Sequence, residues 1–436
     1  MTVQVSPVRR RQVIDALRRG AVPEAGLDLF AVGLGRFSSA IDEDLRAVAA
    51  GDAVFKAVRG EYGSGKTFFA RWLAERAKSA NLATAEVQIS ENETPLHRLE
   101  TVYRRLTERL TTSSFPPSAL RQIVDTWFYT LEHDALQAEP ELDGPALDKA
   151  VESLLAERLA EVSRSAPTFA TALRGYRTAV AEAEPGVAES ILAWLGGQPH
   201  VAASARRVAG VKGDIDTRAA WSFLQGLLTV LRDCGHPGLL LVLDEVETLQ
   251  RVRSDARDKA LNALRQLIDE VHSGRFPGLY LVITGTPAFY DGQQGVQRLA
   301  PLAQRLATDF SAEPRFDNPR AVQIRLPSFS VDSLTELGGK VRDLYAAGSP
   351  ASARLHSLVD DQYLTDLARS VAGRLGGKVG VAPRLFLKKL VASVLDPVEL
   401  HPDFDPRRHF ELTVSSSELT EVERNAASSD DIALDL

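Results

Sequence analysis

The sequence has little cysteine and no long apolar run. Cys234 is the single cysteine in 436 residues, which excludes an internal disulfide and a cysteine-based metal cage. No apolar run approaches the roughly 20 residues that a membrane helix needs, and the start, MTVQVSPVRRRQVIDALRRG, lacks the apolar core of a signal peptide. These absences predict a cytoplasmic protein with no membrane contact, in which Cys234 serves packing rather than nucleophilic chemistry.

Metal-ligand patterns and excess positive charge are also missing. The eight histidines show no metal-ligand spacing, and no GxSxG nucleophile motif occurs. The sequence has 51 Lys and Arg residues and 58 Asp and Glu residues, which gives a formal net charge of −7. This balance argues against a protein that coats nucleic acid through bulk charge. One local basic cluster remains, and a solvated helix explains it more simply than a DNA contact: Arg9, Arg10, Arg11, Arg18 and Arg19.

The stretch GEYGSGKT is a complete phosphate-loop motif. Glycines let successive backbone N–H groups curl around phosphates, and the following helix points its positive end at the same anion. A predicted strand (54–58) precedes the motif and a predicted helix follows it, as the motif requires. Lys66 would neutralise β- and γ-phosphate charge, and the Thr67 hydroxyl would face Mg²⁺. The candidate nucleotide-binding residues here are Gly60, Glu61, Tyr62, Gly63, Ser64, Gly65, Lys66, Thr67 and Phe68.

A second motif, LLLVLDE (239–245), supplies the carboxylates that a phosphate loop lacks. The apolar run predicts a buried strand, and its end places Asp244 and Glu245 at the carboxyl edge of a sheet, where ligands bind in open α/β folds. Asp244 is predicted to hold Mg²⁺, directly or through water. Glu245 is predicted to orient and polarise the attacking water, whereas Glu247 is predicted to be solvated.

Apolar strands that alternate with helices predict an α/β fold with a parallel sheet covered on both faces. The expected strands are 54–58, 83–90, 239–245, the run LYLVITGTP and 321–326. The helical stretch at about 95–213 is best explained as a large insertion between the second strand and the carboxylate strand, and 196–213 is expected to be a loop. Its aromatic residues Trp127, Phe128, Tyr129 and Trp194 are predicted to be core, with a partner surface as the alternative.

Four segments follow from this order. Residues 1–50 are predicted to be lead-in helices, and residues 51–327 an ATPase domain that contains the insertion. Residues 328–396 are predicted to form a C-terminal helical lid. Residues 397–436 are acidic and predicted to be flexible.

Further polar residues could complete a hydrolytic site. Thr284 or Thr286, at the end of LYLVITGTP, could touch the γ-phosphate or the lytic water. Arg305 could reach a neighbouring subunit's phosphates and stabilise transition-state charge, with Arg298 as the rival candidate. Arg384 lies at a predicted helix start, a position that the helix dipole disfavours for a cation, and this favours a functional role.

The phosphate loop, LLLVLDE, ITGTP and APR occur in the order of the AAA+ superfamily, and the set resembles its origin-recognition-like branch. VP, at Val22 and Pro23, followed by AVGLGRFSSAIDEDL resembles that branch's lead-in, where the chain closes over adenine. More narrowly, KAVRGEYGSGKTFFARWLAERA, VITGTPAFYDGQQGVQRLAPLAQRL and FDNPRAVQIRLPSF resemble the ATP-binding proteins of bacteriophage-exclusion (BREX) systems.

The resemblance implies ATP and Mg²⁺ as ligands, a sensor at Thr284 or Thr286, a finger acting across subunits at Arg305, and a second sensor in the lid at Arg384. It also implies other defence proteins as partners. The chain after the lid is too short for the winged-helix DNA module of origin-binding relatives, which leaves DNA binding open.

Three functions remain to be weighed. The first is an ATP-hydrolysing switch of an anti-phage complex. The second is a nucleotide-dependent scaffold with little hydrolysis, if no homo-oligomer brings a second subunit's Arg305 to the site. The third is a DNA-loader or transposition-regulator ATPase.

Overall fold

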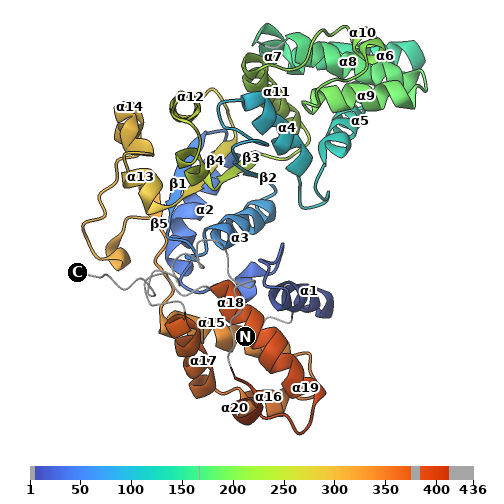
Figure 1. Cartoon of the computed structure of the whole chain (residues 1–436). Coiled ribbons are helices and arrows are strands. Elements are labelled where there is room, and N and C mark those ends of the chain that lie inside the picture. Colours follow the sequence, from blue (N-terminus) through green and yellow to red (C-terminus); the bar gives the residue numbers. More distant parts are fainter. Residues whose placement is uncertain (1–4, 166, 375–382, 412–436) are drawn as a thin grey trace. The chain divides into compact units, whose positions relative to one another are not determined.

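The computed structural model describes residues 5–165, 167–374 and 383–411 (Figure 1). The chain divides into two compact units, each built from separate stretches of sequence. One unit comprises Met1–Ser39, Val58–Glu75 and Asp309–Leu436, and the other comprises Ala40–Ala57 and Arg76–Thr308. The predicted boundaries at residues 50 and 327 therefore do not coincide with the units by which the chain packs.

Five parallel strands form one sheet in the order β2-β3-β4-β1-β5. The strands are β1 (Val54–Arg59), β2 (Ala83–Gln88), β3 (Leu239–Asp244), β4 (Leu279–Gly285) and β5 (Gln323–Arg325). Every residue of β3 and β4 is buried, as expected for apolar strands covered on both faces. The α/β fold with a parallel sheet is therefore confirmed.

The chain between β2 and β3 is helical over the described residues. Its helices are α4 (Leu99–Arg109), α5 (Leu120–Ala138), α6 (Gly144–Arg158), α7 (Ala160–Ser165), α8 (Pro167–Ala181), α9 (Pro185–Leu195), α10 (Ala203–Val208) and α11 (Thr217–Asp233). Helix α10 lies inside the segment predicted to be a loop, so that prediction was wrong. The helix is short, and its one buried residue, Ala205, gives too weak an apolar pattern to detect.

The aromatic residues of these helices are mostly core. Trp127 and Trp194 are buried, and their indole N–H groups donate to Asp233 (2.9 Å) and to the Gly213 carbonyl (2.9 Å). Phe128 is buried as well, whereas Tyr129 is 70% exposed. A buried indole needs a partner for its N–H, and both have one. The core interpretation holds for three of the four residues.

Helix α11 begins at a side-chain cap, which makes its stability testable. The Asp216 carboxylate accepts a hydrogen bond from the Ala219 N–H at 2.8 Å. Asp216→Ala is expected to lower stability by about 1 kcal/mol, whereas Asp216→Asn, an equally good cap, should change it little. Urea unfolding measures both variants, and an equal loss in the two would contradict the capping role.

The remaining elements of the same unit follow β3 and β4. They are η2 (Val246–Gln250), α12 (Ser254–His272), α13 (Pro287–Asp291), η3 (Val296–Arg298) and α14 (Ala300–Arg305). Helix α2 (Gly35–Ala49) precedes β1, and four of its apolar residues, which recur at helical spacing, are buried: Phe37, Ile41, Leu45 and Val48.

The unit that holds the phosphate loop also contains the C-terminal helices. Its elements are α1 (Pro7–Arg18), η1 (Leu27–Leu29), α3 (Lys66–Ser79) as far as Glu75, η4 (Pro314–Phe316), α15 (Val331–Ala346), α16 (Ser352–Leu358), α17 (Asp361–Arg374), α18 (Pro383–Lys388), the π-helix η5 (Lys389–Leu395), α19 (Asp396–Leu400) and α20 (Pro406–His409). Helix α1 packs against α15, α18 and η5, and Figure 1 labels α1 near α18. The N-terminal helix therefore belongs to the C-terminal bundle. Of the predicted flexible tail, residues 397–411 include α20 and most of α19, and the rest lies outside the described residues.

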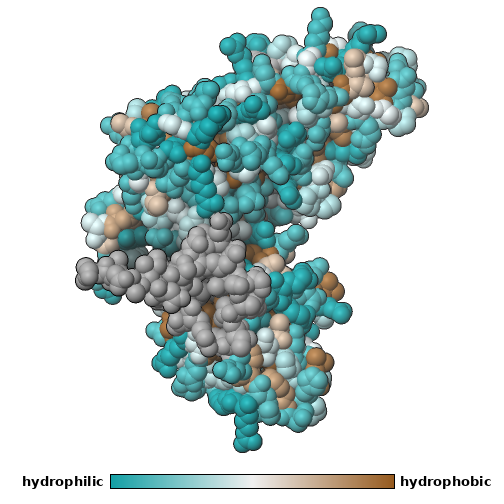
Figure 2. All heavy atoms as spheres, in the orientation of Figure 1, coloured by the Kyte–Doolittle hydropathy of each residue, from teal (hydrophilic) through white to brown (hydrophobic). Residues whose placement is uncertain are grey.

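Hydrophilic residues cover most of the face seen in Figure 2, and hydrophobic residues are scattered singly over it. Scattered apolar side chains are normal on a protein surface. Within the described residues, no helix combines the length and apolar character that crossing a bilayer requires.

Candidate functional site

The phosphate loop joins the end of β1 to the start of α3, as the motif requires. Gly63 (φ +77°) and Gly65 (φ +90°) adopt the left-handed conformation that glycine tolerates best. Gly60 is needed for another reason, since a Cβ there would lie 2.2 Å from the Ser64 Oγ. The three glycines thus serve two structural needs, a left-handed backbone at Gly63 and Gly65 and a close approach at Gly60.

The loop has features that suit a phosphate. Ser64 is buried, and its Oγ makes no hydrogen bond within the part of the chain that the structure describes. The first backbone N–H groups of an α-helix also have no partner inside the helix, and the bond from the Phe69 N–H to the Gly65 carbonyl (2.8 Å) marks where the helical pattern of α3 begins. These donors would meet the needs of a bound anion.

Lys66 lies inside the loop with its ammonium group turned onto backbone carbonyls. It is buried, and its Nζ donates to Gly60 O at 2.9 Å and to Glu61 O at 3.3 Å. The ammonium group also lies 5.0 Å from the centroid of the Tyr62 ring. Thr67, next along α3, is partly exposed.

The carboxylates lie where β3 ends, against a threonine of β4. Asp244 is the last residue of β3, and its Oδ1 accepts hydrogen bonds from the Thr284 hydroxyl and, at 3.1 Å, from the Glu245 N–H. The Thr284 Oγ1 also accepts from the Glu245 N–H at 3.2 Å. Leu243 is in register with Ile283, which brings the next residue of each strand together. Of the two threonine candidates, Thr284 contacts the carboxylate, whereas Thr286 is buried at the start of α13.

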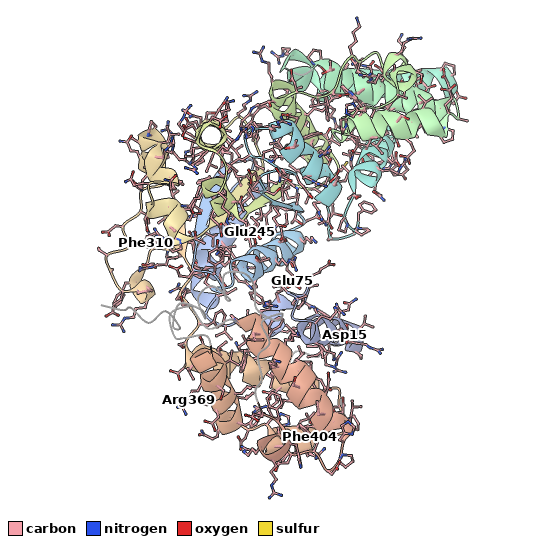
Figure 3. The ribbon with its side chains drawn as sticks, viewed as in Figure 1. Asp15, Glu75, Glu245, Phe310, Arg369 and Phe404 are labelled. Carbon is pink, nitrogen blue, oxygen red and sulfur yellow. The ribbon has the colours of Figure 1, made fainter. Side chains whose placement is uncertain are left out.

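Glu245 leaves β3 in a conformation that is rare for a residue with a side chain. Its φ is +60° and its ψ is +43°, in the left-handed region. Such strain often marks a functional position. Its Oε2 accepts a hydrogen bond from the Gln88 Nε2 at 2.8 Å (Figure 3 labels Glu245). Gln88 ends β2 and is in register with Asp244.

Gln88 was missed by sequence reasoning, although a signal existed. It is a polar residue at the end of the second strand, and a parallel sheet places such ends at one edge.

Glu247 was predicted to be solvated, and that prediction was wrong: its side chain is buried on η2, one turn after β3. A strand end indicates that a carboxylate lies near the sheet edge, but not which way the next turn points it.

Both candidate arginine fingers form ion pairs with acidic residues of the same chain. Arg305 ends α14 and forms a bidentate ion pair with Asp269 of α12, and its Nη1 donates to Pro301 O at 2.7 Å. Arg298 pairs with Asp258 and donates to the Ser254 hydroxyl at 2.8 Å. Neither arrangement tests a role across subunits.

The lid and lead-in candidates lie in the other unit. Arg384 is exposed in the first turn of α18, and the residues before Pro383 lie outside the described part. Pro23 is buried, and the Val22 carbonyl accepts a hydrogen bond from Arg71 at 2.6 Å. Phe68 packs edge-on against Phe30, with ring centroids 5.3 Å apart.

Cys234 and clustered metal ligands offer no competing chemistry. Burial raises the pKa of the Cys234 thiol to about 12, so the group is protonated at neutral pH and unsuited to nucleophilic attack. Among the described residues, no three His, Cys, Asp or Glu side chains gather as a metal site would need. A magnesium ion that arrives with a nucleotide needs few protein ligands, because the phosphates and water supply the others.

Comparison with known proteins matches the chain to one family model. A search of curated proteins finds no match to the chain. The family model described as BREX system ATP-binding protein BrxC/D matches residues 5–414, which includes the phosphate loop, Gln88, Asp244, Thr284 and the C-terminal helices. This is the family that the sequence resembled. A match over nearly the whole chain shows that the protein belongs to the BrxC/D family of BREX system ATP-binding proteins.

Proposed function

We propose that the protein is an ATP-hydrolysing switch of a BREX defence complex. The observation that carries the proposal is the strand order: β1, which leads into the phosphate loop, and β3, which ends at Asp244, flank β4 in one parallel sheet. Parallel strands present their carboxyl ends at the same edge, where ligands bind. A triphosphate held by the loop would then face the carboxylates.

Each residue has a role that its surroundings support. Lys66 would exchange its carbonyl partners for phosphate oxygens, and Thr67 and Asp244 would hold Mg²⁺, which supplies charge neutralisation when bound. Glu245 would accept a proton from the attacking water. Gln88 would orient the Glu245 carboxylate, and Thr284 would orient Asp244.

The contrast between the two threonines can be tested by removing one hydroxyl at a time. Thr284→Val keeps the shape of the side chain and removes its bonds to Asp244 and to the Glu245 N–H. It should lower kcat roughly 10- to 100-fold, because a hydrogen bond to a charged group contributes about 1.5–3 kcal/mol. ATP affinity should change little. Thr286→Val is the matched control, and a larger effect there would reverse the assignment.

The whole proposal is tested by calorimetry and phosphate release on the purified chain, alone and with other proteins of its system. ATP with Mg²⁺ should bind and turn over, and chelation of Mg²⁺ should abolish turnover. If no ATP uptake were detected, the proposal would fail. Turnover stimulated by DNA and lost steeply with salt would favour the DNA-loader alternative instead.

The scaffold alternative is favoured by one observation. Arg305 forms an ion pair with Asp269 of the same chain. This pair would have to break before Arg305 could reach the site of a neighbouring subunit. Light scattering with and without ATP separates the two functions: the switch with Arg305 acting across subunits predicts ATP-dependent assembly and turnover together. The scaffold predicts ATP binding with negligible turnover.

The proposal also covers the lid, the helical insertion and the place in the cell where the protein acts. Residues 328–396 would act as a lid that closes on ATP through Arg384, and the insertion at about 95–213 would contact other defence proteins. We propose the cytoplasm as the site of action.

A further inference from the structure

The loop that leads into β5, residues 309–322, contains one short helix, η4, and no other regular element; we call it the β5 loop. A connection of this length without regular structure is usually either functional or disordered. Contacts from its own unit fix this loop, and three arginines take part in them: Arg36, Arg59 and Arg325. A loop fixed in this way indicates a functional surface.

Arg325 fixes the loop from β5. Its guanidinium forms a bidentate ion pair with Asp317, at 2.7 and 2.8 Å, and the Asp317 side chain is only 7% exposed. The same group donates to the carbonyls of Phe310 (3.2 Å) and Ala312 (2.9 Å). A bidentate pair of charged groups is strong and also restricts geometry. One side chain thus joins three points of the loop.

Two further arginines contact the loop from other segments of the same unit. Arg36, in the first turn of α2, donates to the Pro314 carbonyl at 2.9 Å and to the Arg325 carbonyl at 2.8 Å. The guanidinium groups of Arg59 and Arg325 each lie 4.9 Å from the centroid of the Phe310 ring, which Figure 3 labels. Backbone carbonyls carry no net charge, so these two hydrogen bonds of Arg36 leave its positive charge beside the loop.

Phe316 and Arg315 extend from this loop into solvent. Phe316, the last residue of η4, is 67% exposed, and the Arg315 guanidinium lies 4.5 Å from the centroid of its ring. The Arg315 side chain is 71% exposed and pairs with Glu313 at 2.7 Å. An exposed ion pair contributes at most about 1 kcal/mol, so another anion can compete for the guanidinium. Arg320, further along the loop, is exposed as well.

An exposed aromatic ring among guanidinium groups matches single-stranded nucleic acid. A base stacks on a single ring, and guanidinium groups meet the phosphates on either side of it. A protein partner would need a contiguous apolar core. Within residues 309–322, which the structure describes throughout, Phe316 is the one large apolar side chain that is exposed. This isolation favours a base over a protein surface.

The N-terminal arginine cluster is a weaker candidate for the same ligand. Arg9 pairs with Asp28 and Glu75, and Arg18 pairs with Asp396. These acids offset the positive charge, and residues 5–20 contain no aromatic side chain on which a base could stack. Part of the cluster that was predicted to be solvated is therefore engaged in internal ion pairs.

We propose that the β5 loop is a binding site for single-stranded nucleic acid, in which Phe316 stacks on one base and Arg315, with Arg320, contacts the adjacent phosphates. The site goes beyond the proposed ATP hydrolysis and does not depend on it, because its residues belong to neither the phosphate loop nor the carboxylate strand. A net charge of −7 argues against coating of nucleic acid, but a local site with few phosphate contacts needs no bulk positive charge.

The test measures the affinity of the full chain for fluorescent oligo-dT and oligo-U by anisotropy, without ATP, between about 50 and 200 mM salt. Phe316→Ala and Phe316→Leu should each lower the affinity about 5- to 100-fold, because both remove base stacking, and Phe316→Trp should retain it. Arg315→Gln should make the slope of log affinity against log salt less steep by about 0.7, the value for one phosphate contact on a single strand. Arg315→Lys keeps the charge and should restore the slope.

Two controls change similar side chains elsewhere. Tyr129→Ala removes an aromatic ring that is 70% exposed on α5, and Arg369→Gln removes an exposed guanidinium of α17. Neither should change the affinity or its slope with salt. The substituted side chains are all exposed, so the melting temperatures of the variants should match that of the wild type.

No binding of either oligonucleotide by the wild type at about 50 mM salt, or equal affinity in the wild type and Phe316→Ala, would overturn the inference. It would fail as well if Phe316→Ala left the affinity intact and reduced the mass measured by light scattering, because the ring would then contact a second copy of the chain. Binding with the expected losses supports it, and the tighter of the two oligonucleotides identifies the polymer. A chain that bound oligonucleotides but not ATP would overturn the proposed function and leave this inference standing.

Discussion

Replacing Glu245 with glutamine is expected to leave ATP binding near the wild-type level and to lower ATP turnover about 10²- to 10⁴-fold, the range for loss of a general base. The amide keeps the size of the side chain but cannot take a proton from water. In the wild type, Glu245 has a left-handed backbone just after β3, and its carboxylate accepts a hydrogen bond from Gln88 at 2.8 Å. Both features orient the carboxylate.

Two variants make the Glu245 result specific. Glu247→Gln changes the buried acid two positions along and should reduce turnover far less, after correction for any loss of folded protein. Gln88→Ala should lie between them, because Glu245 remains but loses its orienting partner. Phosphate release measures turnover, and calorimetry measures binding. Wild-type turnover in Glu245→Gln would remove this residue from the mechanism.

Lys66→Ala is expected to have the largest effect on binding. The ammonium group would form charge-assisted bonds to phosphate, and removing one partner of a buried charge pair typically costs 2–5 kcal/mol, which is about 30-fold or more in affinity. The Lys66 ammonium group also contacts loop carbonyls at 2.9 and 3.3 Å, so its removal is expected to cause a modest loss of stability as well.

The control for Lys66 is Lys149→Ala, which removes an exposed lysine of α6 and should leave ATP affinity unchanged. Melting without nucleotide separates misfolding from lost binding. Stabilisation of the wild type by ATP, and its absence in Lys66→Ala, is the expected pair of results. If Lys66→Ala bound ATP as well as the wild type, the phosphate loop would not be the nucleotide site.

Much of the fold could be predicted because its signals are local. The runs around Leu241 and Leu281 predicted buried strands from continuous apolar residues, and β3 and β4 are fully buried. The buried residues of α2 likewise follow a helical spacing that can be seen in the sequence. By contrast, α10 was missed because a short helix with one buried residue carries almost no periodic signal.

The candidate site was predicted in part. Motif spacing predicts Lys66 and Asp244 as site residues without any structure. Spacing could not choose between Thr284 and Thr286, because both follow the same strand, and the choice depended on register with β3. Gln88 belongs to no motif, and it becomes notable only through its hydrogen bond to Glu245, which lies far along the chain.

The sequence by itself determined the phosphate loop, the carboxylate strand, the α/β class and the family. These depend on residue type and short spacing, which a chain carries before it folds. Tertiary structure alone decided that Glu247 is buried, that Asp269 pairs with Arg305 and that α1 packs with the C-terminal helices. Each of these features depends on contacts between residues far apart along the chain or on the direction of one turn. A local sequence pattern specifies neither the contacts nor the direction.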